Sequence, residues 1–309
     1  MGILEDVQGD IRRLADTAGP SVVGIGQRWG VGSGVVIGDS RVLTNAHNVR
    51  GERATVTFSD ARTAEGRVVG FDLDGDLAVV EVDTAGAPPL PWAAEASPGI
   101  GTPVFALANP GGRGLRVTVG FVSGVERSFR GPRGRRITGS IEHTSPLLPG
   151  SSGGPVLDAE GRLLGINTNR LGEGFYLAIP ADGALRARVD ALARGESARK
   201  PRLGIALAPA HVARRLRRAV GLPDTEGLLV REVEEGSPAA SAGLAGGDLI
   251  VQAAGQAVGG VDDLFDALDG AVGTIELKIL RGAEERTVQV AFETAGGQEG
   301  SASPPQETP

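Results

Sequence analysis

The segment "LLPGSSGGPV", residues 147–156, places a serine among residues with unusual backbone freedom. Gly150 stands two positions before Ser152, and Gly153 and Gly154 follow it directly. Two interpretations are open at this point. The glycines can serve a tight turn between two strands, or they can let backbone N–H groups crowd around a serine oxygen and its reaction partner. The second interpretation makes Ser152 a candidate nucleophile.

A serine nucleophile needs a base, and the base needs an orienting carboxylate. The chain has three histidines, His47, His143 and His211. His47 stands in "RVLTNAHNV", at the end of an apolar strand where a loop can present it. His143 lies just upstream of the serine in an expected adjacent strand, and His211 belongs to a later region. We therefore favour His47 as the base.

Three aspartates compete for the role of the orienting carboxylate. The segment "DLDGDLAVVEV" contains Asp72, Asp74 and Asp76. Asp76 immediately precedes an apolar strand, a position well suited to burying a carboxylate against an imidazole. The other two can be ordinary turn residues, so Asp76 is the favoured candidate.

Composition limits the other kinds of chemistry. A chain of 309 residues suggests about two domains, and 40% apolar residues are ample for packed cores. The net charge of −7 argues against a general binder of nucleic acids or anionic membranes. The absence of cysteine excludes disulfides and thiol catalysis, and three scattered histidines do not predict a zinc site. We predict no metal and no cofactor.

Hydrophobic patterns divide the chain into regions. Residues 1–19 have an amphipathic helical pattern, and residues 20–193 are a succession of short β-type segments closed by one helix, typical of an all-β sandwich or barrel. Residues 194–201 are polar and predict a linker. Residues 202–293 mix strands and helices, as in a small α+β domain. Residues 294–309 have almost nothing to bury and are expected to be disordered.

One helix of the second region has a regular apolar pattern. In "AHVARRLRRAVG" the residues Val212, Leu216 and Val220 repeat every fourth position. We expect this apolar face to be buried and the arginines between these residues to point outward.

The order "TNAH", "DGDLAVVEV", "PGSSGGP" resembles the chymotrypsin-like serine proteases, and specifically the HtrA family. "GSGVVI", "VTVGFVSGVER" and "GFYLAIP" match further, and "GSPAASAGLAGGDLI" resembles a PDZ domain. The resemblance covers about residues 20–293. It implies a mainly β fold, in which a chymotrypsin-like double β-barrel protease domain is followed by a small α+β PDZ domain.

The resemblance also implies roles for residues. His47 is the general base and later the general acid, Asp76 orients it, and Ser152 attacks the scissile carbonyl. The N–H groups of Gly150 and Ser152, with Ser151 between them, form the oxyanion hole.

Three positions depart from the family pattern: Ser151 replaces the usual asparagine, Thr144 replaces an acidic residue, and Asn48 follows the histidine in place of an aliphatic residue. They leave the resting geometry of the oxyanion turn open.

Specificity can be interpreted in part from the same segments. "TSPLLPGSS" carries no acid that could receive a lysine or arginine side chain. We expect Leu147, Ile166 and Leu177 to form an apolar S1 pocket that favours aliphatic residues. The alternative is that these three residues only belong to the core.

The PDZ resemblance implies a groove for the C-termini of peptides or proteins. An extended peptide adds a strand to an exposed edge at "LGIAL". The residues expected to contact it are Leu203, Gly204, Ile205, Ala206, Leu264 and Leu268. The alternative is that this domain only packs against the protease as a cap.

The function implied is an ATP-independent serine endopeptidase acting on unfolded or misfolded proteins. The alternative is a peptide-binding or chaperone-like protein with little proteolytic activity. The resemblance allows a homotrimer, although the N-terminal segment lacks the aromatic residues that help many family members to trimerise. Without a signal peptide or membrane span, the chain as written is expected in the cytoplasm, or outside it if a leader was removed.

A basic segment, "ERSFRGPRGRR", has two open interpretations. It contains Arg127, Arg130, Arg133, Arg135 and Arg136. It is either a solvated hairpin loop or, as the resemblance implies, a regulatory loop that contacts acidic groups. Nucleic-acid binding is not expected, because the net charge is negative and the arginines are not interleaved with a series of aromatic residues.

Overall fold

The structure is a computed structural model that describes residues 2–26, 31–93, 98–132, 134–172, 174–196, 201–269, 271 and 273–292. The chain divides into two compact units, residues 1–198 and 199–309, and each is described by itself. The expected tail, residues 294–309, and half of the expected linker, residues 197–200, lie outside the described residues, as does Arg133.

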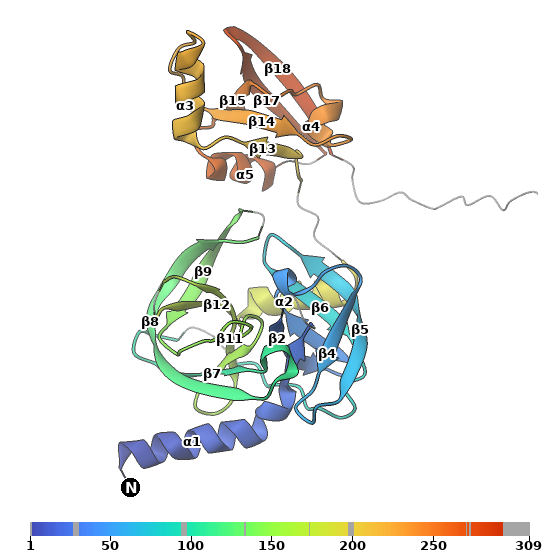
Figure 1. Cartoon of the computed structure of the whole chain (residues 1–309), viewed down its shortest axis with the longest axis vertical. Helices are drawn as coiled ribbons and strands as arrows, with labels where there is room; N and C mark the ends of the chain where they lie inside the picture. Colours follow the sequence, from blue (N-terminus) through green and yellow to red (C-terminus); the bar gives the residue numbers. More distant parts are fainter. Residues whose placement is uncertain are drawn as a thin grey trace, which may run out of the picture. The chain divides into compact units, whose positions relative to one another are not determined.

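The first unit consists of two closed antiparallel barrels (Figure 1). The first barrel has the order β1-β2-β3-β6-β5-β4 and is formed by β1 (Val22–Ile25), β2 (Gly32–Gly38), β3 (Arg41–Thr44), β4 (Arg53–Thr57), β5 (Thr63–Asp72) and β6 (Leu77–Glu81). The second has the order β10-β11-β12-β9-β8-β7 and is formed by β7 (Pro103–Ala108), β8 (Arg116–Arg130), β9 (Arg136–His143), β10 (Pro155–Leu157), β11 (Leu163–Arg170) and β12 (Tyr176–Pro180). Closure leaves neither barrel with an open sheet edge.

The largest hydrophobic core of this unit draws on both barrels. Val22 and Leu43 of the first barrel belong to the same buried cluster as Leu107 and Leu157 of the second. Because close-packed side chains resist displacement, this shared core holds loops from the two barrels in a fixed relation. The active-site candidates come from such loops.

Helices flank the barrels. α1 (Ile3–Thr17) buries Leu14 but leaves Leu4 exposed. α2 (Gly183–Ala193) begins after Asp182, whose carboxylate accepts a hydrogen bond from the Leu185 N–H at 2.8 Å. There are also single turns of 3-10 helix: η1 (Gly19–Ser21) joins α1 to β1, and η2 (Ala46–Asn48) and η3 (Pro110–Gly112) each lie between two strands. No helix in the described part of the chain is long and apolar enough to cross a membrane.

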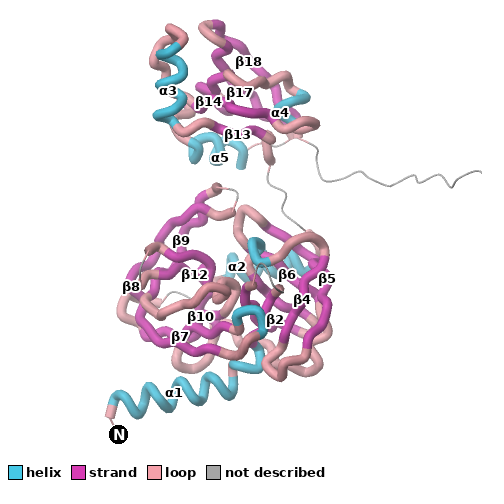
Figure 2. The backbone as a smooth tube through the Cα atoms, viewed as in Figure 1, coloured by secondary structure: helices cyan, strands magenta, loops and turns pink. Residues whose placement is uncertain are grey.

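The second unit is a small α+β structure, and Figure 2 shows its sheet and helices. The sheet has the order β13-β14-β15-β17-β18, with β16 paired to β15; its strands are β13 (Ile205–Leu207), β14 (Leu228–Val233), β15 (Asp248–Ala253), β16 (Gln256–Ala257), β17 (Thr274–Arg281) and β18 (Glu284–Ala291). The helices are α3 (Ala210–Ala219), α4 (Pro238–Ser241) and α5 (Val261–Asp269). The predicted fold class, mainly β with a double barrel and a small α+β unit, is confirmed.

The prediction for α3 is confirmed only in part. Val212 is half-buried, and Arg214, Arg215 and Arg218 are exposed as expected, but the rest of the apolar face is not buried. Leu216 is 50% exposed and Val220 72% exposed, whereas Arg217 is only 4% exposed. The chain after the helix folds back beneath it, because the Leu222 N–H donates to the Arg217 carbonyl at 3.0 Å. This return turns the Ala213 and Arg217 side of the helix inward.

Candidate active site

His47 and Asp76 form the central contact of the site. His47 lies on the single turn η2 after β3, and its Nδ1 is 2.9 Å from each carboxylate oxygen of Asp76. The His47 backbone N–H also donates to Asp76 Oδ1 at 3.2 Å. Asp76 is 2% exposed, while the His47 side chain is 38% exposed. A buried carboxylate therefore fixes an imidazole that remains open to a substrate.

The turn before β6 has an unusual backbone. Asp76 has φ of 55°, in the left-handed region that non-glycine residues rarely adopt. The Asn45 side-chain amide donates to the Asp76 carbonyl at 2.9 Å and so stabilises this conformation. Strain of this kind persists where the surroundings impose it, which is common at functional sites.

The other two aspartates of the turn have different partners. Asp72 Oδ1 accepts hydrogen bonds from the N–H groups of Asp74 and Gly75, and its Oδ2 lies 3.5 Å from Arg188 Nη1 on α2. Asp74 Oδ1 lies 3.3 Å from Arg135 Nε, with both side chains 6% exposed. Within the described residues, Asp76 alone of the three contacts His47.

Two side chains from the first barrel hold the backbone around Ser152. The Ser152 carbonyl accepts from the Ser33 N–H at 2.8 Å and from the Asn48 side-chain amide at 2.9 Å. The Ser33 hydroxyl donates to the Gly150 carbonyl at 2.9 Å. Gly153 has φ of 87°, and a Cβ there would lie 2.1 Å from the Ser33 carbonyl oxygen. The glycine after the serine is therefore required by the close approach of the two barrels.

Asn48, a departure from the family pattern, is one of these supporting side chains. Its amide also donates to Thr44 Oγ1 at 3.0 Å. A second departure, Thr144, accepts a hydrogen bond from the Phe121 N–H at 3.0 Å.

Thr168 connects the carboxylate and the serine, and sequence reasoning missed it. Its hydroxyl donates to Asp76 Oδ2 at 2.6 Å, and its carbonyl accepts from Ser152 Oγ at 3.1 Å. Thr168 lies on β11, in the segment "GINTN", residues 165–169. The only signal in the sequence was its position near the end of an apolar strand that follows the serine.

The serine hydroxyl is turned toward Thr168. In the described part of the structure no hydrogen bond joins His47 and Ser152, since Ser152 Oγ donates to the Thr168 carbonyl. The Gly150 and Ser152 N–H groups likewise have no acceptor among the described residues. Two backbone donors beside a serine oxygen are what a tetrahedral oxyanion would require.

A pocket of about 160 Å³ adjoins Ser152. The lining residues come from the serine loop and from β11 and β12: Leu147, Leu148, Pro149, Gly150, Ser151, Ser152, Asn167, Thr168, Asn169, Arg170 and Tyr176. No acidic side chain is among these described residues.

The predicted S1 residues are corrected in part. Leu147 lines the pocket, but Ile166 and Leu177 do not. Both are fully buried in the core shared by the barrels, because side chains on a strand alternate between faces and these two point inward. Asn167, Thr168 and Tyr176 occupy the pocket wall in their place.

His143 is buried behind this pocket. Its Nε2 is 2.9 Å from Asn167 Oδ1, its ring stacks on Tyr176 with centroids 5.9 Å apart, and its Nδ1 has no partner among the described residues. Burial lowers the pKa of His143 from 6.5 to about 4, against the opposing hydrogen bond with Asn167. His143 is a neutral structural histidine in this arrangement. His211 lies on α3 in the second unit.

The second unit has an open sheet edge at β13, which pairs with β14 alone. The Leu203 and Gly204 carbonyls accept hydrogen bonds from the N–H groups of Ala239 and Glu234, both at 2.9 Å. Their own N–H groups have no acceptor among the described residues. Gly204 has φ of 77°, and a Cβ there would lie 2.3 Å from the Ser237 Cβ. Two free donors thus stand at the start of a free strand edge.

The predicted residues of this edge divide into two groups. Ile205 is half-buried and Ala206 exposed, as a peptide-binding strand needs. Leu264 and Leu268 are each 2% exposed and pack with Leu203 in the core, so they are not open to a ligand. The half-buried apolar side chains of α5 are instead Val261, Phe265 and Ala267.

No group of three or more metal-ligating side chains is present among the described residues.

Two segments of the chain match known domain families. Residues 32–166 match the trypsin-like peptidase domain, and residues 229–281 match the PDZ domain. The histidine stands on the first barrel and the serine before β10 of the second, which places the first unit in the class of chymotrypsin-like serine proteases.

Similar proteins specify the family. DegS, a serine endoprotease of Escherichia coli (strain K12), is 31% identical, over 85% of this chain and 76% of its own length. Protease Do-like 1, chloroplastic, of Arabidopsis thaliana is 34% identical, over 85% of this chain. The crystal structure of the serine endoprotease from Yersinia pestis aligns with a TM-score of 0.62 and 28% identity, covering 91% of this chain and 96% of that one. The chain belongs to the HtrA family of serine proteases, as its motifs predicted.

The chain is shorter than several of its relatives. It spans 64% of the length of Protease Do-like 1 and 60–61% of two further curated relatives.

The pKa of His143 predicts a pH dependence of stability. Because the folded pKa lies below 6.5, the unfolded chain binds a proton between about pH 6.5 and 4 that the folded chain excludes. Stability should therefore be lost as the pH falls through this window. In His143→Gln, which retains a donor for Asn167, the loss between pH 7 and 4.5 should shrink by about 2 kcal/mol.

Urea unfolding followed by tryptophan fluorescence measures this, since both tryptophans, Trp29 and Trp92, belong to the first unit. An identical pH dependence in the two proteins would contradict the prediction.

Proposed function

We propose that the chain is an ATP-independent serine endopeptidase that cleaves unfolded or misfolded proteins. The observation that carries this proposal is the buried Asp76 carboxylate on His47, beside a serine with two adjacent free N–H donors. Membership of the HtrA family supports it.

The geometry supports an acyl-enzyme mechanism. Ser152 Oγ rotates from the Thr168 carbonyl to His47 Nε2, gives up its proton there and attacks the peptide carbonyl carbon. Asp76 stabilises the imidazolium, and the Gly150 and Ser152 N–H groups donate to the oxyanion. His47 returns the proton to the leaving amine, and water then repeats the sequence to release the acyl group.

A second candidate function is a peptide-binding or chaperone-like protein with little proteolysis. The observation that favours it is the Ser152 hydroxyl, which donates to Thr168 and not to His47. Degradation of casein, with and without a serine-directed covalent inhibitor, separates the two functions. Inhibitor-sensitive loss of casein supports the endopeptidase, and intact casein supports the second candidate.

The triad assignment predicts the effects of single substitutions. Ser152→Ala should abolish cleavage, because loss of the nucleophile in a comparable triad costs about a millionfold in turnover. Asp76→Asn should lose roughly ten-thousandfold, because the imidazole then adopts the wrong tautomer. Initial rates of casein cleavage measure both effects.

Ser59→Ala and Asp39→Asn are matched controls for this experiment and should leave the rate unchanged. Both residues are exposed in turns of the first barrel and lie outside the pocket beside Ser152. Substantial cleavage by purified Ser152→Ala would refute the nucleophile. Loss of activity in Asp74→Asn but not in Asp76→Asn would refute the choice of carboxylate.

The pocket predicts cleavage after aliphatic residues such as Val, Ala or Leu. Leu147 and Tyr176 contribute apolar surface, and Arg170 contributes a positive charge. Burying a lysine or arginine side chain there without an acidic partner would be very costly. Sequencing the new ends of digested casein measures the preference, and a majority of cuts after Lys or Arg would overturn it.

We propose that the second unit binds the C-termini of peptides or proteins. A peptide adds a strand to the free edge of β13, and the Leu203 and Gly204 N–H groups hold its carboxylate. Arg202 forms an ion pair with Glu234, so the two backbone donors are the main feature that supports carboxylate capture.

This proposal predicts that amidation of the peptide weakens binding. The full chain carrying Ser152→Ala should bind a peptide with an apolar free C-terminus about 10-fold or more tightly than its amide, because hydrogen bonds to a charged group are lost. Calorimetric titration of both peptides measures this, and equal affinities would rule out carboxylate capture.

The oligomeric state and the cellular location of the chain are proposed from its sequence alone. Leu4 of α1 is 84% exposed, and a contact with further copies of the chain in a homotrimer is one way to bury it. A cytoplasmic location, or an extracytoplasmic one after removal of a leader, is retained on the same basis.

A further inference from the structure

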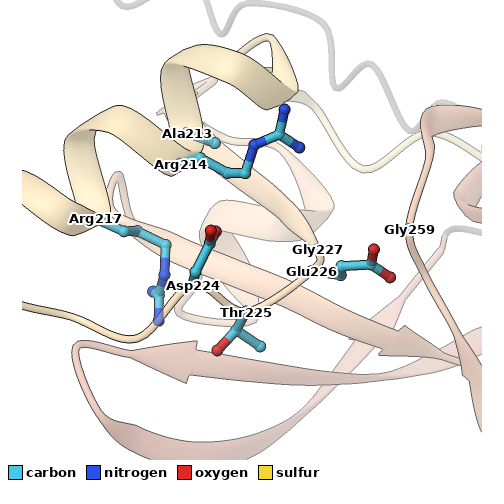
Figure 3. A pocket seen from close by; sticks show the side chains of 8 residues that line it. All are labelled: Ala213, Arg214, Arg217, Asp224, Thr225, Glu226, Gly227 and Gly259. Carbon is cyan, nitrogen blue, oxygen red and sulfur yellow. The ribbon is translucent and has the colours of Figure 1, made fainter.

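A pocket of about 110 Å³ lies in the second unit between α3, the chain that follows it and the loop at Gly259 (Figure 3). Its lining residues are Ala213, Arg214, Arg217, Asp224, Thr225, Glu226, Gly227 and Gly259. None of these belongs to the β13 edge or to α5.

Arg217 gives this pocket a buried cation. It is 4% exposed, its Nε donates to the Pro223 carbonyl at 3.2 Å, and its Nη1 is buried without a hydrogen-bond partner among the described residues. Figure 3 shows its guanidinium on the same side of the pocket as Asp224 and Thr225. A buried donor of a charged group that lacks a partner is unfavourable, and an acceptor entering the pocket relieves that cost.

The charges of the pocket favour a single negative group. Asp224 already pairs with Arg218, which does not line the pocket. Among the described lining residues, Glu226 is therefore the one acidic group without an ion pair. It stands against two cationic side chains, Arg214 and Arg217. Two guanidinium groups against one unpaired carboxylate leave an excess of about one positive charge, which a single carboxylate neutralises.

The outer face of α3 adds an apolar surface beside the pocket. Leu216 and Val220, one helical turn apart, are 50% and 72% exposed. The C-terminal half of α3 and its cap thus expose Leu216 and Val220 and bury Arg217, the reverse of the pattern expected there for an isolated domain, whereas Val212 is half-buried. Local conflicts of this kind concentrate at functional sites. One ligand with an acidic and an apolar residue would pair the buried Arg217 guanidinium and cover the exposed Leu216 and Val220.

We propose that this pocket binds the carboxylate of a glutamate or aspartate side chain in a peptide segment that places an apolar residue on Leu216 and Val220. Arg217 Nη1 donates to the carboxylate, and Arg214 adds a second positive charge at the rim. The site is separate from the β13 edge and requires no free C-terminus, so it is available to internal segments of a bound protein.

The test uses the full chain with Ser152→Ala, so that binding is measured without cleavage. The probes are acetyl-Glu-Ala-Ala-Leu-amide and its Gln analogue, both amidated to remove the terminal carboxylate. The Glu peptide should bind about 10-fold more tightly and should shift the NMR amide signals of Thr225, Gly227 and Gly259. Equal affinities, or shifts confined to Leu203–Leu207, would overturn the proposal.

Two further substitutions, each combined with Ser152→Ala, test whether the Glu peptide binds at Arg217. Arg217→Gln should abolish the preference for the Glu peptide, and Arg215→Gln, an exposed arginine of α3 outside the pocket, should retain it. Circular dichroism checks the fold; if Arg217→Gln does not fold, Arg214→Gln at the rim should lower the preference several-fold. A preference that survives in a folded Arg217→Gln, or one that stays at about 10-fold in Arg214→Gln where that variant replaces it, would overturn the proposal.

Inorganic phosphate is the third probe. Weaker binding than that of the Glu peptide supports a carboxylate site, and tighter binding overturns it. None of these outcomes depends on proteolysis, so they are distinguishable from a failure of the proposed function.

Discussion

The first unit depends on the burial of one negative charge, the Asp76 carboxylate. A buried carboxylate is tolerated only when donors satisfy it. Here the donors are the His47 N–H and imidazole from the first barrel and the Thr168 hydroxyl from the second. The charge therefore joins the two barrels, and neither barrel alone supplies all of its partners. Its turn is fixed in addition by Arg188 of α2, through Asp72, and by Arg135, through Asp74.

The ion pair of Asp74 and Arg135 joins the basic hairpin between β8 and β9 to the turn that carries Asp76. Arg135, one of the five arginines singled out in the sequence, is 5% exposed and not a solvated loop residue. It lies against an aspartate two positions before Asp76. Removing one partner of a buried ion pair leaves an uncompensated charge, at a cost of about 3–5 kcal/mol. A displacement of this hairpin that separates Arg135 from Asp74 would thus destabilise the turn that carries Asp76.

The sequence predicts those site residues that lie in a short, recognisable segment. Ser152 stands among glycines and Asp76 directly before an apolar strand, so short segments identify them. Thr168 could not be identified, because its role comes from a contact across 92 positions in the chain. Ile166 and Leu177 were placed on the wrong face because a continuous buried strand has no polar alternation to mark its orientation. For α3 the period was right, but the return of the following chain beneath Arg217 decides which face is buried.

The position of the Ser152 hydroxyl shows how little separates the resting arrangement from a reactive one. His47 is already held by Asp76, and the Ser152 carbonyl is held by Ser33 and Asn48. A reactive arrangement needs this hydroxyl proton to pass to His47 Nε2 in place of the Thr168 carbonyl. Exchanging one hydrogen bond of this kind for another changes the free energy by about 1 kcal/mol. A substrate that favours the rotated hydroxyl by a similar amount would therefore shift its population.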